Sequence, residues 1–161
     1  PYTGFLYAGL MINADGNPYV IEFNCRFGDP ETQPILQRLQ SDLVAHCQSA
    51  LERTLDTAAA QWDPRPAVGV VLAAGGYPNA YEKGHAIAGL DTHWPATTKV
   101  FHAGTQTHDG TIVTHGGRVL CVSALGNTIE EAIQLAYAGV DHINWQDMIF
   151  RQDIGWRAID R

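Results

Sequence analysis

The stretch VIEFNCRFGDPET, residues 20–32, places a cluster of polar side chains directly after an apolar run. The cluster comprises Glu22, Asn24, Arg26, Asp29 and Glu31. Residues two apart in a strand project from the same face, so the oxygens of Glu22 and Asn24 can converge on one ion. A carboxylate with an amide carbonyl is an all-oxygen ligand pair, which suits Mg²⁺ or Mn²⁺ better than Zn²⁺. Two protein ligands suffice for Mg²⁺ when nucleotide phosphates supply the others.

The residues after this pair extend the chemistry. Arg26 lies one strand step beyond Asn24, where its guanidinium could take up charge during phosphoryl transfer. Gly28 frees the backbone, and Asp29 and Glu31 are acids that could hold an amine. An E-x-N spacing is also common at ordinary polar strand ends, so the spacing alone leaves both interpretations open.

A hairpin is expected to carry the cluster. The apolar runs Phe5–Ile12 and Tyr19–Phe23 flank the sequence NADGNP, residues 13–18. Asp-Gly beside a proline is strong turn chemistry, so the two runs are predicted to pair antiparallel. The glycine and two prolines within Arg26–Pro34 predict a loop after the second strand.

A helix is predicted next, capped by Ser41-Asp42 and extending to about Leu55. The sequence DPRP, residues 63–66, then reads as a stiff connector. The strands predicted beyond it are Ala67–Ala74, Lys99–Ala103, Thr111–Thr114 and Arg118–Ala124. Thr128 and Glu131 form a capping-box pattern before a helix with an apolar face. We therefore predict an α+β chain with a first domain over residues 1–62 and a β-rich module over residues 63–161.

The composition limits the function classes. The chain has 161 residues, is 45% hydrophobic and carries a net charge of −7, with Lys83 and Lys99 as its only lysines. This composition supports a packed core and argues against nucleic-acid or membrane-surface partners. Three cysteines without a CxxC pattern predict reduced thiols and a cytoplasmic location. No apolar run reaches the roughly 18 residues needed to span a bilayer. The start at Pro1, without methionine, predicts a piece of a longer protein.

Six motifs together resemble one family. GFLYAGLM, EFNCRFGDPETQPIL, AAGGYP, FHAGT, GGRVLCVSALG and DIGWRAI occur in the order found in phosphoribosylamine–glycine ligases, also called glycinamide ribonucleotide synthetases. The resemblance covers essentially the whole chain. It implies that residues 1 to about 60 are the end of an ATP-grasp domain and that the remainder is a C-terminal barrel-sandwich module.

This resemblance implies a reaction and roles for the cluster. The family joins glycine to 5-phosphoribosylamine with ATP in de novo purine synthesis, through a glycyl phosphate. Glu22 and Asn24 match its metal ligands, for Mg²⁺ or Mn²⁺. Arg26 matches an arginine beside the transferring phosphate, as a catalytic residue. Asp29, Pro30 and Glu31 match the substrate-side loop.

The sequence also departs from the family pattern. No N-terminal α/β domain or nucleotide-covering lid fits before Pro1, and the first strand carries no acid, although some relatives have a metal carboxylate there. We therefore expect only half a site, an inactive chain when isolated, and self-association through apolar surface that includes Phe5–Met11.

Two alternatives stay open at this point. One is another ATP-grasp carboxylate–amine ligase, although RFGDPET and DIGWR do not belong to those enzymes. The other is a non-catalytic carrier module, whose modified lysine would have to be Lys83 or Lys99. We interpret His102, His108 and His115, Lys83, Arg118 and the Gly75-Gly76 turn as structural or solvated, and Cys25 as a small core residue.

Overall fold

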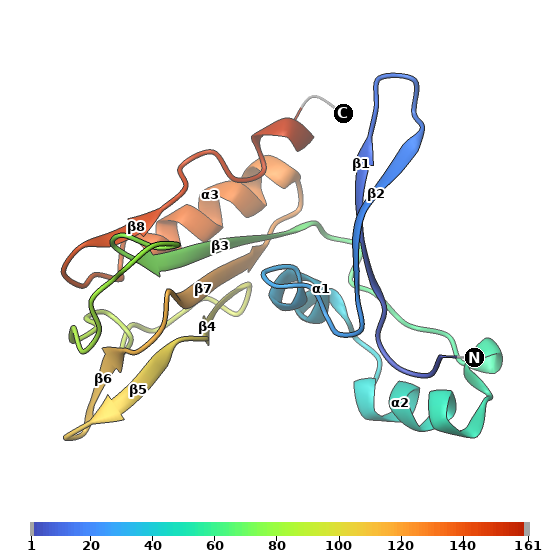
Figure 1. Cartoon of the computed structure of the whole chain (residues 1–161), viewed down its shortest axis with the longest axis horizontal. Helices are drawn as coiled ribbons and strands as arrows, with labels where there is room; N and C mark the ends of the chain where they lie inside the picture. Colours follow the sequence, from blue (N-terminus) through green and yellow to red (C-terminus); the bar gives the residue numbers. More distant parts are fainter. Residues whose placement is uncertain (1, 160–161) are drawn as a thin grey trace. The chain divides into compact units, whose positions relative to one another are not determined.

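The computed structural model describes residues 2–159 and divides into two compact units (Figure 1). The first comprises Pro1–Thr32 with Leu39–Trp62, and the second comprises Gln33–Arg38 with Asp63–Arg161. Every named strand pairs antiparallel with its neighbours, which confirms the α+β class. Among the described residues, no helix has the length and apolar character needed to cross a membrane. The predicted boundary between residues 62 and 63 stays a prediction about family domains.

The first unit begins with the predicted hairpin, formed by β1 (Tyr7–Ile12) and β2 (Pro18–Asn24). Its turn is stabilised by the side chain of Asn13, whose Oδ1 accepts the backbone N–H groups of Asp15 at 3.0 Å and Asn17 at 2.8 Å. Such side-chain to backbone bonds are why asparagine favours turns. The hairpin prediction is confirmed.

The rest of the first unit is helical. Helix α2 (Leu43–Glu52) is capped as predicted by Asp42, whose carboxylate accepts the N–H of Val44 at 2.7 Å. It ends three residues before the predicted Leu55, because Arg53 adopts a left-handed conformation with φ of 61°. A short 3₁₀ turn, η1 (Leu55–Thr57), follows.

Helix α1 (Thr32–Arg38) corrects the prediction of a loop through Pro34. Pro34 lies in the first turn of this helix, where backbone N–H groups have no intrahelical partner, so proline is tolerated there. The residues Gln33–Arg38 pack with the second unit.

A four-stranded sheet forms the centre of the second unit, in the order β4-β7-β3-β8. Its strands are β3 (Ala67–Ala74), β4 (Thr98–His102), β7 (Arg118–Leu125) and β8 (Met148–Phe150). Helix α3 (Ile129–Val140) packs on the face that carries Val68, Val70 and Val122. Gly139 lets the helix approach closely, since an added Cβ would lie 2.7 Å from Val122 Cγ1. The core is this helix-on-sheet layer.

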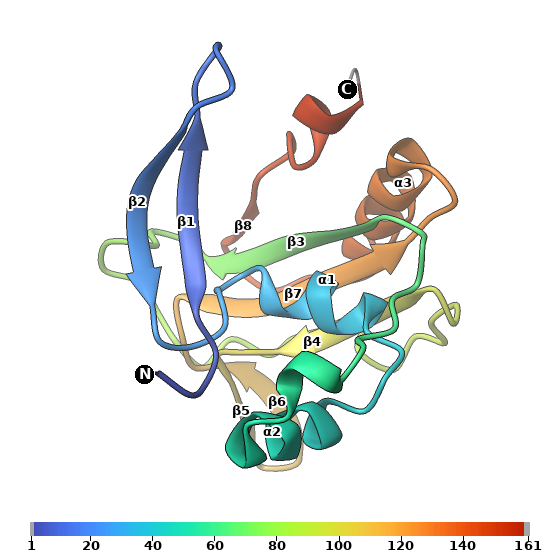
Figure 2. The same cartoon turned by 90° about the vertical axis from the view of Figure 1, so that its right-hand side faces the viewer.

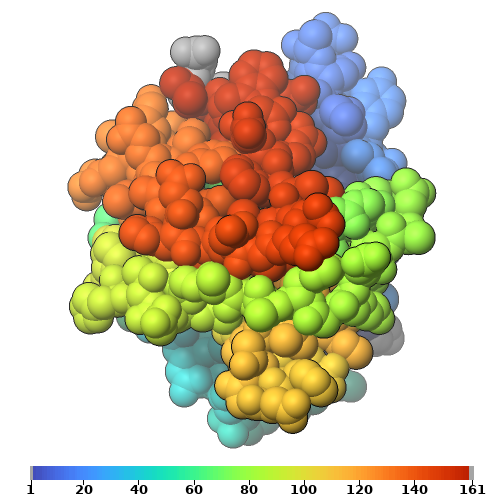
Figure 3. Space-filling model, turned by 90° about the vertical axis from the view of Figure 1, so that its left-hand side faces the viewer, coloured from blue at the N-terminus to red at the C-terminus, as the bar shows by residue number. Residues whose placement is uncertain are grey.

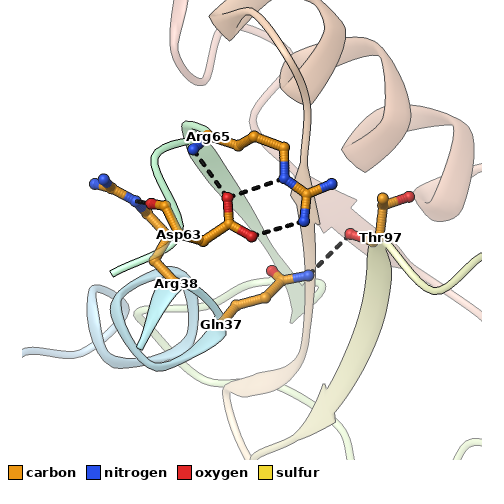
Figure 4. Close-up of polar contacts among 5 residues, drawn as sticks. All are labelled: Gln37, Arg38, Asp63, Arg65 and Thr97. Carbon is orange, nitrogen blue, oxygen red and sulfur yellow. Dashed lines mark hydrogen bonds and ion pairs between the residues drawn. The ribbon is translucent and has the colours of Figure 1, made fainter. Parts of the chain in front are cut away.

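Helix α1 contacts the opposite face of the same sheet (Figure 2). The alternation of side chains along strands places Gly69, Cys121 and Ser123 on that face. Pro34 lies over Gly69, where an added Cβ would stand 3.3 Å from Pro34 Cδ. Gln37 Oε1 accepts a hydrogen bond from the Ser123 hydroxyl at 2.6 Å. Gln37 Nε2 donates to the Thr97 carbonyl at 2.9 Å (Figure 4).

The entry to β3 is fixed by an ion pair (Figure 4). Asp63 accepts the backbone N–H and Nε of Arg65, both at 2.9 Å, and Nη2 at 2.7 Å. Arg38 Nε donates to the Asp63 carbonyl at 3.1 Å. The side-chain and backbone hydrogen bonds from Arg65 lower the pKa of Asp63 to about 2.

Helix α3 confirms the predicted start at Thr128, whose hydroxyl accepts the N–H of Glu131 at 3.2 Å. In a standard capping box, the Glu131 carboxylate would accept the backbone N–H of Thr128. Here it accepts the backbone N–H of Asn127, at 2.6 Å. The predicted strands of this unit are present with ends shifted by at most one residue.

The sequence did not predict β5 (Thr105–His108), which pairs with β6 (Thr111–Thr114), or the edge strand β8. On the face of the second unit in Figure 3, the orange-red segment around β8 lies beside the green segment that follows β3. A bridge between Ala88 and Asn144 joins these segments. A last 3₁₀ turn, η2 (Trp156–Ala158), follows β8.

Candidate active site

The predicted cluster lies at the end of the hairpin where β1 begins and β2 ends. Gly9 is opposite Glu22, and Tyr7 is opposite Asn24. Leu10 pairs with Val20, so Ile21 is an extra residue in β2 and forms a bulge. The Glu22 side chain lies against Gly9, where an added Cβ would stand 3.2 Å from Glu22 Cγ. Bulges redirect side chains next to functional sites, and this one directly precedes Glu22.

Glu22 and Asn24 project from the same face, as predicted. Asn24 Nδ2 donates to Glu22 Oε1 at 2.9 Å. Glu22 is exposed and Asn24 is half-buried. The strand spacing therefore does bring the carboxylate and the amide together, while their role as ligands stays a prediction.

The pair fits a Mg²⁺-type ion. Its carboxylate and amide supply oxygen donors, which are the ligands that Mg²⁺ prefers. The hydrogen bond of 2.9 Å from Asn24 Nδ2 to Glu22 Oε1 shows that the two side chains reach each other. Within residues 2–159, no group of three His, Cys, Asp or Glu side chains gathers for a metal. A divalent ion here would have Glu22 and Asn24 as its protein ligands.

Glu31 joins this end of the hairpin through Tyr7, whose hydroxyl donates to Glu31 Oε1 at 3.1 Å. This hydrogen bond and the charge of Glu31 raise the pKa of Tyr7, and the charge of Glu22 adds to the increase. Both carboxylates thus act on the same phenol. The role of Tyr7 could not be predicted from local spacing, because Tyr7 lies 24 positions from Glu31 in the sequence.

The loop that carries the three predicted substrate residues is closed at its base. The backbone N–H of Thr32 donates to the Gly28 carbonyl at 3.1 Å, and the Thr32 hydroxyl bonds to the same oxygen. The peptide bond between Asp29 and Pro30 is cis. Asp29 is exposed, whereas Pro30 and Glu31 are half-buried.

Arg26 is exposed, and its Nη1 donates to the carbonyl of Phe27 at 2.8 Å. The Phe27 ring stacks on Phe5 with 4.0 Å between centroids. The described contacts of Arg26 are therefore local, and they do not include Glu22 or Asn24. Its assignment to a transferring phosphate stays a prediction.

The other singled-out residues do not join the cluster. Cys25 is exposed, so its prediction as a core residue is wrong. It follows Asn24 at the end of β2, in a part of the hairpin without a covering layer in the first unit. The histidines His102, His108 and His115 are on the surface, as predicted. Arg118 Nε donates to the Tyr77 hydroxyl at 2.9 Å. That contact lies in the second unit.

Comparison with family models decides the relationship. The phosphoribosylglycinamide synthetase C domain matches residues 67–157, and the ATP-grasp (A) domain of the same synthetase matches residues 1–32. The chain belongs to the phosphoribosylglycinamide synthetase family. The resemblance inferred from the six motifs is confirmed.

Curated relatives agree along the whole chain. A phosphoribosylamine–glycine ligase from Vibrio cholerae is 62% identical over 160 residues, covering 99% of this chain and 37% of the relative. One from Allochromatium vinosum is 62% identical, covering 100% of this chain and 38% of the relative. The Escherichia coli ligase is 60% identical, covering 99% and 38%. The chain thus spans a little over a third of the length of these relatives.

Solved structures support the fold. The phosphoribosylamine–glycine ligase of Thermotoga maritima matches with a TM-score of 0.75 and 38% identity, over 92% of this chain and 36% of that one. A biotin carboxylase domain from Hydrogenobacter thermophilus matches with a TM-score of 0.59 and 13% identity, over 89% of this chain and 32% of that one. At that identity, the second likeness shows the fold alone.

Proposed function

We propose that this chain is the C-terminal part of a ligase that joins glycine to 5-phosphoribosylamine with ATP, giving glycinamide ribonucleotide, ADP and phosphate. This places it in de novo purine synthesis in the cytoplasm. The observation that carries the proposal is the identity of about 60% with phosphoribosylamine–glycine ligases across both family regions. The partners are then the two substrates, ATP and the remaining domains of the enzyme.

The reaction needs activation of a carboxylate. A glycine carboxylate oxygen attacks the γ-phosphorus of ATP, the bond to the β–γ bridging oxygen breaks, and ADP leaves. The amine of phosphoribosylamine then attacks the acyl carbon of the glycyl phosphate. Phosphate departs with the electrons of the carbon–oxygen bond, and the amine nitrogen loses a proton.

The cluster supplies charge control for these steps. Glu22 and Asn24 would hold the divalent ion, Mg²⁺ or Mn²⁺, which when bound neutralises phosphate oxygens. Arg26 follows this pair in the sequence. Its guanidinium would stabilise the negative charge that develops on the transferring phosphoryl group. The loop Asp29–Pro30–Glu31 faces the substrate side, held by the bonds of Thr32 to Gly28.

Glu22 and Arg26 are exposed, which matters because an acyl phosphate must be kept from water. We therefore expect the 161-residue chain by itself to be inactive.

Two other functions have less support. A different ATP-grasp ligase is disfavoured because the curated relatives described above are phosphoribosylamine–glycine ligases. A carrier role is disfavoured because Lys99 lies within β4, paired with Ser123, and Lys83 lies in a coil between non-neighbouring strands.

The test uses the full-length enzyme that contains this segment. Glu22→Gln keeps the shape and removes the charge that holds the ion. We expect kcat to fall about 10²–10³-fold, with the KM for glycine much less affected, because charge stabilisation matters most during transfer. Product is measured by mass at saturating ATP and Mg²⁺.

Two controls accompany this variant. Glu52→Gln changes an exposed glutamate of α2 outside the cluster and should leave turnover unchanged. The isolated 161-residue chain should form no product. Unchanged kcat for Glu22→Gln would remove the metal assignment, and a wild-type enzyme that forms no glycinamide ribonucleotide would remove the proposed function.

A further inference from the structure

The phenol of Tyr7 has no part in the chemistry described so far, yet it is built into the cluster. Its hydroxyl donates to Glu31 Oε1 at 3.1 Å, and both side chains are half-buried. Tyr7 stands opposite Asn24 in the hairpin register. One residue therefore connects the strand that carries Glu22 and Asn24 to the loop that carries Glu31.

Gly28 leaves the space in which Tyr7 and Glu31 meet. An added Cβ at Gly28 would clash with Glu31 Oε2 and would lie 2.9 Å from two ring carbons of Tyr7. Gly28 is buried, and its φ is not in the left-handed range. The glycine is thus required for space rather than for conformation. The carboxylate and the ring occupy the space that a side chain at this position would need.

The Glu31 carboxylate is consequently held from two sides. Tyr7 binds one oxygen, and the other lies in the space that a side chain at position 28 would occupy. The bonds of Thr32 to the Gly28 carbonyl fix the loop base directly after Glu31. A carboxylate that is fixed in this way is suited to orient a cationic ligand, because little conformational freedom is lost when the ligand binds.

We propose that Tyr7 is a positioning residue that orients the Glu31 carboxylate toward the ammonium group of glycine. This inference rests on the proposed function. Of the two substrate amines, that of glycine is protonated at neutral pH, whereas that of phosphoribosylamine must be neutral to attack an acyl carbon. A carboxylate pairs with the cation. Glu31 therefore recognises glycine, and Tyr7 acts through Glu31.

The experiment measures steady-state kinetics of the full-length enzyme that contains this segment. Tyr7→Phe removes only the hydroxyl and should raise the KM for glycine about fivefold to tenfold, which is the range expected for a lost hydrogen bond. The KM for ATP and the kcat at saturating glycine should stay within about twofold of wild type. Tyr19→Phe is the matched control, since Tyr19 is an exposed tyrosine on β2, away from Glu31.

A second comparison separates positioning from a general effect on folding. Glu31→Gln should raise the KM for glycine more than Tyr7→Phe does. In the double variant, the loss of the Tyr7 hydroxyl should add nothing further, because its only route is through the Glu31 carboxylate. Should Tyr7→Phe not fold, Glu31→Asp keeps the charge but withdraws it from the phenol, and the same selective increase is expected.

An unchanged KM for glycine in Tyr7→Phe, or a full additional effect of Tyr7→Phe in the Glu31→Gln background, would overturn the inference while leaving the ligase activity in place. An equal increase in the KM of all three substrates would also overturn it. Loss of the proposed function itself is recognised separately, by a wild-type enzyme without product.

Discussion

Asp63 shows how a single residue can couple this fold to pH. Its pKa is lowered from 3.8 to about 2 by hydrogen bonds from Arg65, so the folded chain holds the charged form more strongly than the unfolded chain does. The resulting stabilisation is complete above the unfolded pKa near 4 and is lost as the pH falls toward 2. We expect Asp63→Asn to destabilise the second unit at about pH 6 and much less at about pH 2.5.

Urea unfolding midpoints at the two pH values check this prediction. Asp91→Asn serves as a control, because Asp91 is an exposed carboxylate of the same unit. A difference between Asp63→Asn and wild type that stays constant with pH would contradict the assignment of the effect to the carboxylate charge.

At the candidate site, the sequence could predict contacts only between residues that are close together along the chain. Glu22 and Asn24 are two apart in a strand, so their common face follows from the strand period. Tyr7 and Gly28 meet Glu31 only through the hairpin register and the loop closure, which no local pattern encodes. The orientation of Arg26 toward Phe27 depends on its own loop and was equally unpredictable.

Among the elements, helix α1 is joined to the sheet of the second unit by a buried hydrogen bond. The hydroxyl of Ser123 is fully buried, and Gln37 accepts its hydrogen bond at 2.6 Å. Replacing Gln37 by Leu leaves this hydroxyl without its acceptor, whereas the Thr97 carbonyl keeps its hydrogen bond from the N–H of Leu125 at 2.9 Å. An unsatisfied buried polar group costs about 1–3 kcal/mol. We therefore expect Gln37→Leu to lower the free energy of unfolding by an amount in this range.

A double-mutant cycle tests the cause. Ser123→Ala removes the stranded hydroxyl, so the combined variant Gln37→Leu/Ser123→Ala should be more stable than Gln37→Leu alone. Chemical denaturation of all four chains gives the coupling. Additive effects of the two substitutions would show that α1 is not held to the sheet by this bond.

The elements themselves divide by the strength of their local signals. The hairpin and α3 were predicted because Asn13–Asn17 and Thr128 carry turn and capping chemistry that acts within a few residues. Helix α1 differs from the predicted loop because Pro34, which usually interrupts helices, lies in the first turn, where proline is tolerated. Strand β8 has three residues and exists because it pairs with β3, a long-range contact that its sequence does not encode.

At the scale of the whole molecule, the two units differ in how much apolar surface they bury. The sheet of the second unit is covered by helices on both faces and contains fully buried residues such as Leu72 and Val122. On the hairpin, large apolar side chains are 48–64% exposed. They are Leu10, Met11, Ile12, Tyr19, Val20, Ile21 and Phe23. We expect this surface to favour self-association of the isolated chain.

Hydrogen exchange of the 161-residue chain tests this difference. The amides of β7 are bonded to β3 or β4 on its two sides, within a buried strand, so they should exchange slowly. The β1–β2 hairpin has two strands and exposed faces, and such a ribbon is marginally stable in water, so Phe5–Phe23 should exchange faster.

The measurement is made at several protein concentrations, with sedimentation to establish the monomer. Protection of the hairpin that increases with concentration supports self-association. Equal protection of β7 and the hairpin in a strictly monomeric sample would contradict the prediction, because it would mean that the hairpin is stable without any surface to cover it.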